Sequence, residues 1–429
     1  MKPTSVRFLV LGATMLVAVF MYVDRVCLSQ VKGLVQRDLA LDDYQIDWVL
    51  SAFFWSYALA QVPAGALGVQ YGYARMLAVY LFLWSLFTAL TGLATGFLML
   101  LAARLVVGLT EAGAYPTAAS LVKGWFPTGQ RGRANSVVAL GGRAGGALGQ
   151  RITPVLVVAL AGVAMLEGWR VTLVLFGVLG MLASAAFYLV AKDCAADHPW
   201  ANEAEADLAE PPPPPTCEPF PWLLFLATPN LWLSGLTQFG VNIGWVFLIT
   251  HFPDYLEKVH GLEGNDKGFY ASLPLTVGIA GMFAGGFLTD ALVPRIGLRW
   301  GRALPIGVAL FGCAAAFAVC ASATDPLAVT LALCAVTLCV DLGIPSIWAF
   351  AQDIGGRYVG PVLGYGNMWG NIGAAVSPLL LGYVQRHYGW PAAFQTCALA
   401  FVVAACAALC LNAAKPLRPA DALRGSPAE

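Results

Sequence analysis

Charged residues are scarce in this sequence, and neither sign predominates. Asp, Glu, Lys and Arg make up 11% of the 429 residues, with 24 basic and 24 acidic side chains, and there are only four histidines. Soluble domains carry about a quarter charged residues, so the composition excludes an ordinary soluble protein. The balanced charge also excludes a nucleic-acid-binding protein, because such proteins need a basic face to neutralise phosphates.

Apolar side chains are in excess instead, at 59% of the chain with a mean hydropathy of +0.72. A helix needs about 20 apolar residues to cross a hydrocarbon core of about 30 Å, and the chain has room for about twelve such helices with short loops. Its apolar runs, such as 173–191 and 327–340, are long and continuous, whereas a transmembrane barrel needs short alternating segments. We therefore expect an all-α integral membrane protein with twelve transmembrane helices.

The N-terminus and the cysteines indicate neither processing nor a cofactor. The first apolar run, 8–22, is followed by Asp24 and Arg25 instead of a small-residue cleavage site, so it is predicted to be a span and not a signal peptide. The ten cysteines lie mostly within apolar runs and form no CxxC pair. Because free buried cysteine behaves as a small apolar residue, we expect no disulfide, no metal site and no cofactor.

Hydropathy places six spans before a polar segment and six after it. The first six are expected at 6–27, 46–68, 75–94, 97–124, 132–161 and 168–191, and the second six at 228–256, 266–290, 302–322, 325–351, 359–385 and 390–413. The segment between them, 192–221, is acidic and contains five consecutive prolines, which favour an extended conformation over a packed core. The chain is therefore predicted to form two pseudo-symmetric six-helix bundles, 1–191 and 222–429, joined by a cytoplasmic linker.

The distribution of Lys and Arg predicts the orientation of these spans. With both termini in the cytoplasm, fourteen basic residues lie inside and six outside, and the remaining four, Arg25, Arg104, Arg143 and Arg151, fall within spans. Basic residues near span ends are retained in the cytoplasm. We therefore predict a multi-pass protein of the inner cell membrane with both termini cytoplasmic.

The loop after the second span of each half has a similar glycine-rich pattern. The first copy contains Gly65, Gly68 and Gly72, and in the second copy a glycine pair and an aliphatic residue precede Asp290 and basic residues. This pattern resembles the signature loop of the major facilitator superfamily. In that family the Asp caps a helix end and pairs with basic residues on the neighbouring span.

The two copies of this loop differ at the acidic position. Val69 stands in the first copy where the family has Asp, whereas the second copy keeps Asp290 together with Arg295 and Arg299. The resemblance therefore implies that the charge relay supporting the outward-facing state is weakened in the first half.

Arg104 and Glu111 form the most informative pair of charges within the spans. A charged residue at membrane depth is costly and by default marks a pathway, a partner or a cavity. The two residues are seven positions apart, or about 700° around a helix, so they project from nearly the same face about 10 Å apart. This separation is less natural for an ion pair than three or four residues. Arginine matches a carboxylate, and a desolvated carboxylic acid can carry a proton, so the pair suits an anion and proton symporter.

Two interpretations stay open for the other intramembrane charges. Asp24 and Arg25, which follow Tyr22, either belong to the site or reach water at the membrane interface. Arg143 either contacts an anion or pairs with an acidic residue such as Asp341. The same span contains small residues at spacings that let another helix approach closely, at Gly141, Gly145 and Gly149 and at Gly142 and Gly146.

Uncharged amides in the second half are weaker candidates. Gln238 and Asn242 are four residues apart on one face of the seventh span, and Asn371 lies in the eleventh. Such amides either bind hydroxyl groups of a polar substrate or bridge neighbouring helices.

Seven stretches in order resemble the anion:cation symporter branch of the superfamily, which includes sugar-acid proton symporters, sialin-like carriers and vesicular glutamate carriers. They lie at 22–25, 54–63, 104–113, 125–127 with 131–134, 252–256, 268–274 and 370–373. The resemblance implies that Arg104 holds the substrate carboxylate and that Asp24 and Glu111 are the protonated positions. It also implies that the site is lined by Tyr22, Arg25, Tyr57 and Asn371.

One departure from the family bears on the substrate. Sugar-acid carriers tend to have an amide in the fifth span, where this chain has Gly142 beside Arg143. The added cation would suit a dicarboxylate or a phosphorylated acid.

The sequence thus predicts a monomeric secondary transporter in the lipid bilayer, and not an enzyme, that imports a small organic anion with protons by alternating access. One alternative is an exchanger or exporter without proton coupling, in which Arg143 and Arg151 hold an organic anion or organophosphate. A more distant one is a membrane sensor that binds an anion without moving it, although the linker and tail are short for a signalling domain.

Overall fold

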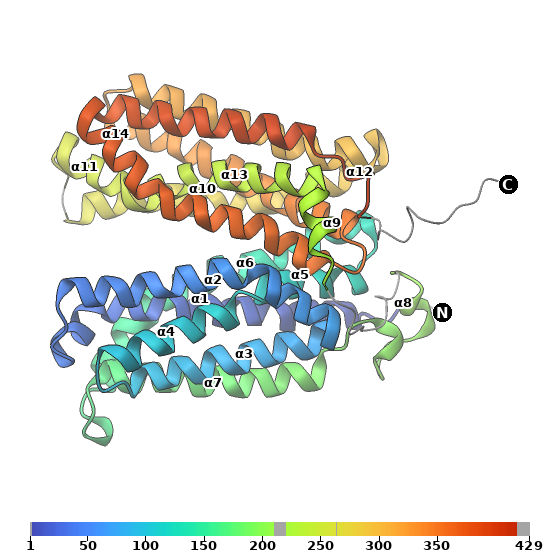
Figure 1. Ribbon diagram of the computed structural model, residues 1–429, viewed down its shortest axis with the longest axis horizontal. Coiled ribbons are helices and arrows are strands. Elements are labelled where there is room, and N and C mark those ends of the chain that lie inside the picture. Colours follow the sequence, from blue (N-terminus) through green and yellow to red (C-terminus); the bar gives the residue numbers. More distant parts are fainter. Residues whose placement is uncertain (1, 210–219, 263, 418–429) are drawn as a thin grey trace. The chain divides into compact units, whose positions relative to one another are not determined.

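The computed structural model describes residues 2–209, 220–262 and 264–417, and this part of the chain consists of helices, turns and loops without a strand (Figure 1). The prediction of an all-α protein is confirmed. The helices of the first half are α1 (Val6–Asp38), α2 (Asp43–Tyr71), α3 (Tyr73–Gly92), α4 (Phe97–Glu111), α5 (Ala114–Trp125), α6 (Arg131–Ala159) and α7 (Gly168–Val190). Those of the second half are α10 (Pro229–Thr250), α11 (Phe252–His260), α12 (Gly264–Ser322), α13 (Pro326–Ile354) and α14 (Val359–Cys410).

Within the described ranges, nine helical segments are long and apolar enough to cross a membrane. Two of them, α12 and α14, contain a break at Gly297 and at Gly389, where φ is 80° and 82°. Glycine adopts such positive φ values without a steric penalty, and the breaks fall where the sequence predicts a loop between two spans. Helix α6 is not among the nine because charged residues interrupt its apolar run. Helices α4 and α5 together form one of the nine, so counting α12 and α14 twice and adding α6 is consistent with the predicted twelve spans.

The helices group into two compact units. Unit 1 comprises Met1–Pro127, Val137–Glu218 and Arg357–Gly364, and unit 2 comprises Thr128–Ser136, Pro219–Gly356 and Tyr365–Glu429. Each unit thus includes one short segment from the opposite half of the sequence. The division into domains 1–191 and 222–429 stays a prediction.

Unit 1 is held together by close helix packing. Helix α2 packs against α4 and α3 packs against α7, and these helices run side by side in Figure 1. Helix α6 lies on α1 through its glycines: a Cβ at Gly145 would come within 2.8 Å of the Val19 Cα, and one at Gly149 within 3.3 Å of the Val23 Cα. The predicted close approach of another helix to this small-residue stripe is confirmed.

The described part of the linker packs against unit 1. The Asp193 carboxylate accepts hydrogen bonds from the backbone N–H groups of Tyr73, at 3.1 Å, and Ala74, at 2.6 Å, at the start of α3. Glu205, in the short helix α8 (Glu203–Ala206), accepts one from the Arg7 N–H at 3.0 Å at the start of α1. Helix N-termini have unsatisfied N–H groups and a positive dipole end, which these carboxylates neutralise.

This packing corrects one expectation about the linker. The composition of the linker, 192–221, predicts a segment that does not pack, but Glu205 is buried among α1 residues. Burial also raises the pKa of the Asp193 carboxyl. The proline run 211–215 lies outside the described residues.

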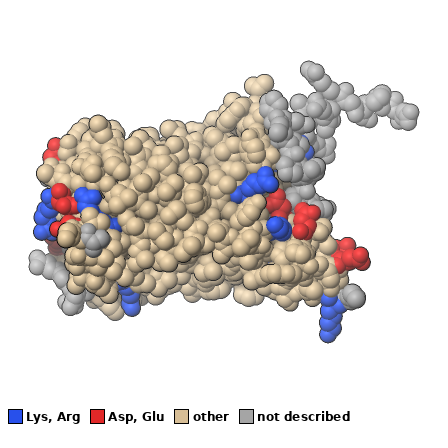
Figure 2. Space-filling view, turned by 90° about the horizontal axis from the view of Figure 1, so that it is seen from below, with Lys and Arg blue, Asp and Glu red and all other residues tan. Residues whose placement is uncertain are grey.

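The charged side chains lie mainly toward the ends of the helices. On the face seen in Figure 2, Lys, Arg, Asp and Glu gather in two groups separated by a wide uncharged band. Such a band is what contact with a hydrocarbon core requires.

Candidate functional site

An ion pair joins α1 and α4 in the interior of unit 1. The Arg25 guanidinium donates from both Nε and Nη2 to Glu111 Oε1, and the Nε distance is 2.8 Å. Glu111 is fully buried. The structure thus places Arg25 inside the site and not at the membrane surface, and it is Arg25, rather than Arg104, that pairs with Glu111.

Aromatic rings surround this cation. The centre of the Arg25 guanidinium lies 4.9 Å from the Tyr22 ring centroid, 5.1 Å from Phe53 and 4.8 Å from Tyr57. Ring faces carry partial negative charge and attract a cation, most strongly where water is excluded. The rings therefore hold the guanidinium in place from several sides while Glu111 binds its edge.

Arg104 and Asp24 are buried beside this pair, but their polar atoms are largely unused. Arg104 is 4% exposed and lies over the Phe53 ring at 4.8 Å, and it has no hydrogen bond or ion pair with any described residue. Both carboxylate oxygens of Asp24 are buried without a hydrogen bond from the described residues, although the Trp84 indole lies beside them. Unit 1 thus contains one buried guanidinium and one buried carboxyl group able to bind something else.

Two tyrosine rings occupy the space beside Gly142 on α6. A Cβ at this position would collide with the Tyr115 hydroxyl and come within 2.7 Å of the Tyr22 ring. The rings lie 6.4 Å apart. A larger residue at 142 would therefore have to displace these rings, including the Tyr22 ring that packs on Arg25.

The two arginines of α6 differ in their surroundings. Arg143 is half-buried and interacts with other residues, whereas Arg151 is exposed and has no hydrogen bond or ion pair within the described part of the chain. Arg143 thus remains a candidate for the site, and Arg151 is separate from the buried cluster.

The predicted amides lie in unit 2, where α10 packs against α14. A Cβ at Gly366 would collide with the Gln238 amide, and one at Gly370 would lie 2.7 Å from Asn242 Nδ2. Asn242 and Asn371 each donate to the carbonyl four residues earlier on their own helix, at 2.9 and 2.8 Å. The Gln238 Nε2 group is buried and has no hydrogen-bond partner in the described chain.

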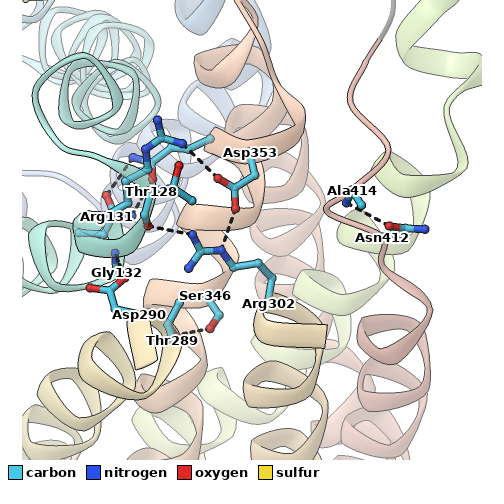
Figure 3. A network of polar contacts seen from close by, with 12 residues as sticks. Thr128, Arg131, Gly132, Thr289, Asp290, Arg302, Ser346, Asp353, Asn412 and Ala414 are labelled. Carbon is cyan, nitrogen blue, oxygen red and sulfur yellow. Dashed lines mark hydrogen bonds and ion pairs between the residues drawn. The ribbon is translucent and has the colours of Figure 1, made fainter. Parts of the chain in front are cut away.

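The second signature loop holds the beginning of α6 within unit 2 (Figure 3). Asp290 accepts hydrogen bonds from the N–H groups of Gly132, at 2.9 Å, and Arg133, at 3.1 Å, and from Arg133 Nε at 3.1 Å. Asp290 therefore caps a helix and pairs with a basic residue, as the resemblance implies, although Arg295 and Arg299 are not its partners.

The neighbouring triad contains none of the predicted site residues. Asp353 accepts from Arg131 Nη1 at 3.1 Å and from Arg302 Nε at 2.7 Å, and Arg302 also donates to the Thr128 carbonyl at 3.2 Å (Figure 3). All three charged side chains are nearly inaccessible to solvent. The only signal was an Asp at the end of one apolar run and an Arg at the start of another.

The first signature loop is arranged differently. A Cβ at Gly65 would lie 2.6 Å from the carbonyl carbon of Gly360, and one at Gly68 would lie 3.2 Å from the Tyr73 ring. Gly72 has a φ of 91° and joins α2 to α3. Asp193 supplies a carboxylate at this turn. The linker therefore provides an acidic side chain close to the loop in which Val69 stands at the position of the signature Asp.

A bundle of apolar helices with buried charges of both signs is the arrangement expected of a membrane transporter. Its family can be stated as well: the chain belongs to the Major Facilitator Superfamily, whose family model matches residues 14–378. The chain is similar to a "Probable sulfoacetate transporter" of Cupriavidus necator, with 28% identity over 95% of this chain and 94% of the relative. It is also similar to a "Probable galactarate/D-glucarate transporter" of Bacillus subtilis, with 30% identity over 90% and 88%.

Solved structures agree on the fold. The fucose transporter FucP in its outward conformation superposes with a TM-score of 0.70 at 17% identity, covering 94% of this chain and 98% of that one. The human organic anion transporter MFSD10 gives a TM-score of 0.71 at 16% identity, with 94% and 99% covered. These similarities support the predicted fold class.

Proposed function

We propose that the protein imports a small organic anion together with protons by alternating access. Arg104 binds the acid group of the substrate, and Asp24 and Glu111 carry protons. The observation that carries this proposal is the buried cluster of unit 1, in which Arg104 has unused donors beside a carboxyl group that accepts no hydrogen bond from the described residues. The relatives named for sulfoacetate and for galactarate or glucarate support an organic acid as the substrate class.

The anion site follows from the chemistry of Arg104. A guanidinium binds a carboxylate or sulfonate through parallel N–H donors, and such charge-assisted bonds are stronger when water is excluded. The Phe53 ring at 4.8 Å fixes one face of Arg104 and leaves its edge for the substrate. Tyr22 and Tyr57 line the same region, and Arg143 adds a second cation for a substrate with two acid groups.

The proton sites follow from the two carboxyl groups. A charged carboxylate without water or a hydrogen-bond donor is costly, so a site such as that of Asp24 accommodates the protonated form. At Glu111, the hydrogen bonds from Arg25 favour the charged form. A substrate anion that attracts either arginine weakens this hold and lets Glu111 accept a proton, which couples the two bindings.

The energetics require such coupling for uptake. An anion that enters against a negative-inside potential meets a cost of about 2.3 kcal/mol per charge per 100 mV. One proton makes the transport of a monovalent anion electroneutral, and two protons make it favoured by the potential. The two carboxyl groups allow either stoichiometry.

The test uses purified protein in proteoliposomes. A thermal-shift screen of sugar acids, sulfonates and dicarboxylates first identifies a ligand, since a ligand that binds the folded state raises the melting temperature. With that ligand, a gradient of two pH units should drive about 100-fold accumulation per coupled proton, because each unit is worth about 1.36 kcal/mol.

The informative variant is Glu111→Gln, which should abolish accumulation driven by pH and keep counterflow exchange. Asp254→Asn is the matched control, because Asp254 is an exposed carboxylate outside the site. Accumulation by Glu111→Gln equal to that of the unaltered protein would refute the coupling role. A transport rate independent of pH in the unaltered protein would instead favour an exchanger.

A further inference from the structure

A cavity of 390 Å³ lies in unit 2, where α10 begins and α14 ends. Its walls include Thr228 and Asn230 at the start of α10, Arg299 from α12, and Asn412 and Lys415 from the chain that follows α14. None of these residues belongs to the buried cluster of unit 1, and Arg299 is not the partner of Asp290.

Hydrogen bonds fix the walls of this cavity. Asn230 Nδ2 donates to the Asn412 carbonyl at 2.9 Å, and the Asn412 N–H donates back to Asn230 Oδ1 at 3.1 Å. The Asn412 side chain then accepts from the Ala414 N–H at 3.0 Å (Figure 3). The chain after α14 is further tied to α13, because the Leu417 N–H donates to the Ile354 carbonyl at 2.9 Å. Lys415 is therefore held at the cavity by its neighbours on both sides.

The charge at the cavity is positive. Among the described residues, Arg299 and Lys415 line the cavity and no acidic residue does, and neither of these two cations has an ion pair there. The two nearby carboxylates, Asp290 and Asp353, are already engaged by other arginines. The N-terminus of α10 adds the positive end of a helix dipole. Arg299 also packs on the Trp300 ring at 4.8 Å.

Apolar side chains flank this positive cavity. In α9 (Trp222–Ala227), which leads into α10, Trp222, Leu223 and Leu226 are 52%, 83% and 54% exposed. The Trp232 indole of α10 donates to the Leu226 carbonyl at 2.9 Å and fixes this short helix. Exposed Trp and Leu beside basic residues are typical of a membrane interface, where the rings lie at the level of the lipid headgroups.

We propose that this cavity binds a phosphate-bearing anion, and that anionic phospholipid is its source. The phosphate lies between Arg299 and Lys415, and the acyl chains lie along α9. Basic pockets between helices at the cytoplasmic side bind anionic headgroups, and the predicted orientation puts this end of unit 2 in the cytoplasm. The proposal is independent of the transported substrate.

The experiment compares ligands on delipidated full-length protein in a neutral detergent. Three probes are titrated while the melting temperature is followed: phosphatidylglycerol, phosphatidylcholine and inorganic phosphate. Arg299→Gln combined with Lys415→Gln removes both cations from the cavity. Arg295→Gln is the matched control, because Arg295 is an exposed arginine of α12 that does not line the cavity.

We expect phosphatidylglycerol to raise the melting temperature and phosphatidylcholine to have little effect. The double variant should bind phosphatidylglycerol about 30-fold more weakly, since each cation near an anionic lipid contributes about a factor of five. Arg295→Gln should bind as the unaltered protein does. Neither cation makes an ion pair in the described chain, so without lipid the variants should melt at the temperature of the unaltered protein. If the double Gln variant melts lower, the charge-conserving double variant Arg299→Lys with Lys415→Arg provides the test instead, and it should bind phosphatidylglycerol as the unaltered protein does.

Two results distinguish a lipid headgroup from a soluble phosphate as the ligand, and a third would refute the site. If inorganic phosphate protects the protein as phosphatidylglycerol does, and the double variant loses that protection, the site stands with a soluble phosphate as its ligand. If only the lipid protects, the headgroup is the ligand. Equal lipid binding by the double variant, Arg295→Gln and the unaltered protein would refute the site.

Discussion

The triad of Arg131, Asp353 and Arg302 allows a prediction of stability. Asp353→Asn keeps the size of the side chain and removes its charge, so two buried guanidinium groups lose their shared carboxylate. The side chains of Arg302 and Asp353 are 1% and 2% exposed, which leaves water little access to compensate. Removing one partner of such a buried pair costs about 3–5 kcal/mol.

An exposed ion pair of the same unit provides the reference. Lys258 and Asp254 lie 3.6 Å apart with exposures of 64% and 56%, so Asp254→Asn should cost no more than about 0.5 kcal/mol. Arg131→Gln should fall between the two, because it leaves the shorter bond from Arg302 to Asp353 intact.

Thermal unfolding in one detergent at one scan rate measures the difference. For a unit of this size, 1 kcal/mol corresponds to about 2–4 °C, so Asp353→Asn should melt at least about 5 °C below Asp254→Asn. Equal melting temperatures for these two variants would show that the buried triad contributes no more to the free energy of unfolding than the exposed ion pair does. Fluorescence-detected gel filtration confirms that each variant is folded before heating.

Two further predictions concern particular contacts. Gly142→Ala should raise the KM for the transported anion, because the added methyl group displaces the Tyr22 ring. Gly146→Ala should leave the KM unchanged, since its Cβ would lie 3.6 Å from that ring. Equal KM values for the two variants would contradict this prediction. Asp193→Asn should remove one component of the pH dependence of melting. Burial raises the pKa of Asp193 in the folded state, so its contribution to stability is full below about pH 3.9 and is lost as the pH rises through the folded-state pKa. If the melting temperatures of Asp193→Asn and of the unaltered protein changed equally with pH between about pH 7 and 4, the prediction would be wrong.

Hydropathy predicted most helices well, because span length is set by the thickness of the hydrocarbon core. Its errors have a physical origin. Helix α1 continues to Asp38 instead of ending near residue 27, because the polar residues after Asp24 are good helix formers that hydropathy cannot distinguish from a loop. The predicted seventh span is divided into α10 and α11 at His251, and Pro253 lies in the first turn of α11.

The candidate site was predictable only within single helices. The seven-residue spacing placed Arg104 and Glu111 on one face, and both are buried. The bond from Arg25 to Glu111 joins residues 86 positions apart on two helices, and no periodic pattern contains that information. The same holds for Asp193 at the start of α3 and for Asp353 between two arginines.

The glycines of α6 have a mechanical consequence. Gly145 and Gly149 of α6 lie against the backbone of α1. If α1 slid along α6 by one residue, a side chain larger than glycine would be pressed against the α1 backbone, and close-packed interiors resist such shifts. Helices α1 and α6 should therefore move together as one body during the transport cycle. The register between Arg25 and Arg143 then stays constant, and the flexible joints of the transporter must lie elsewhere in the chain.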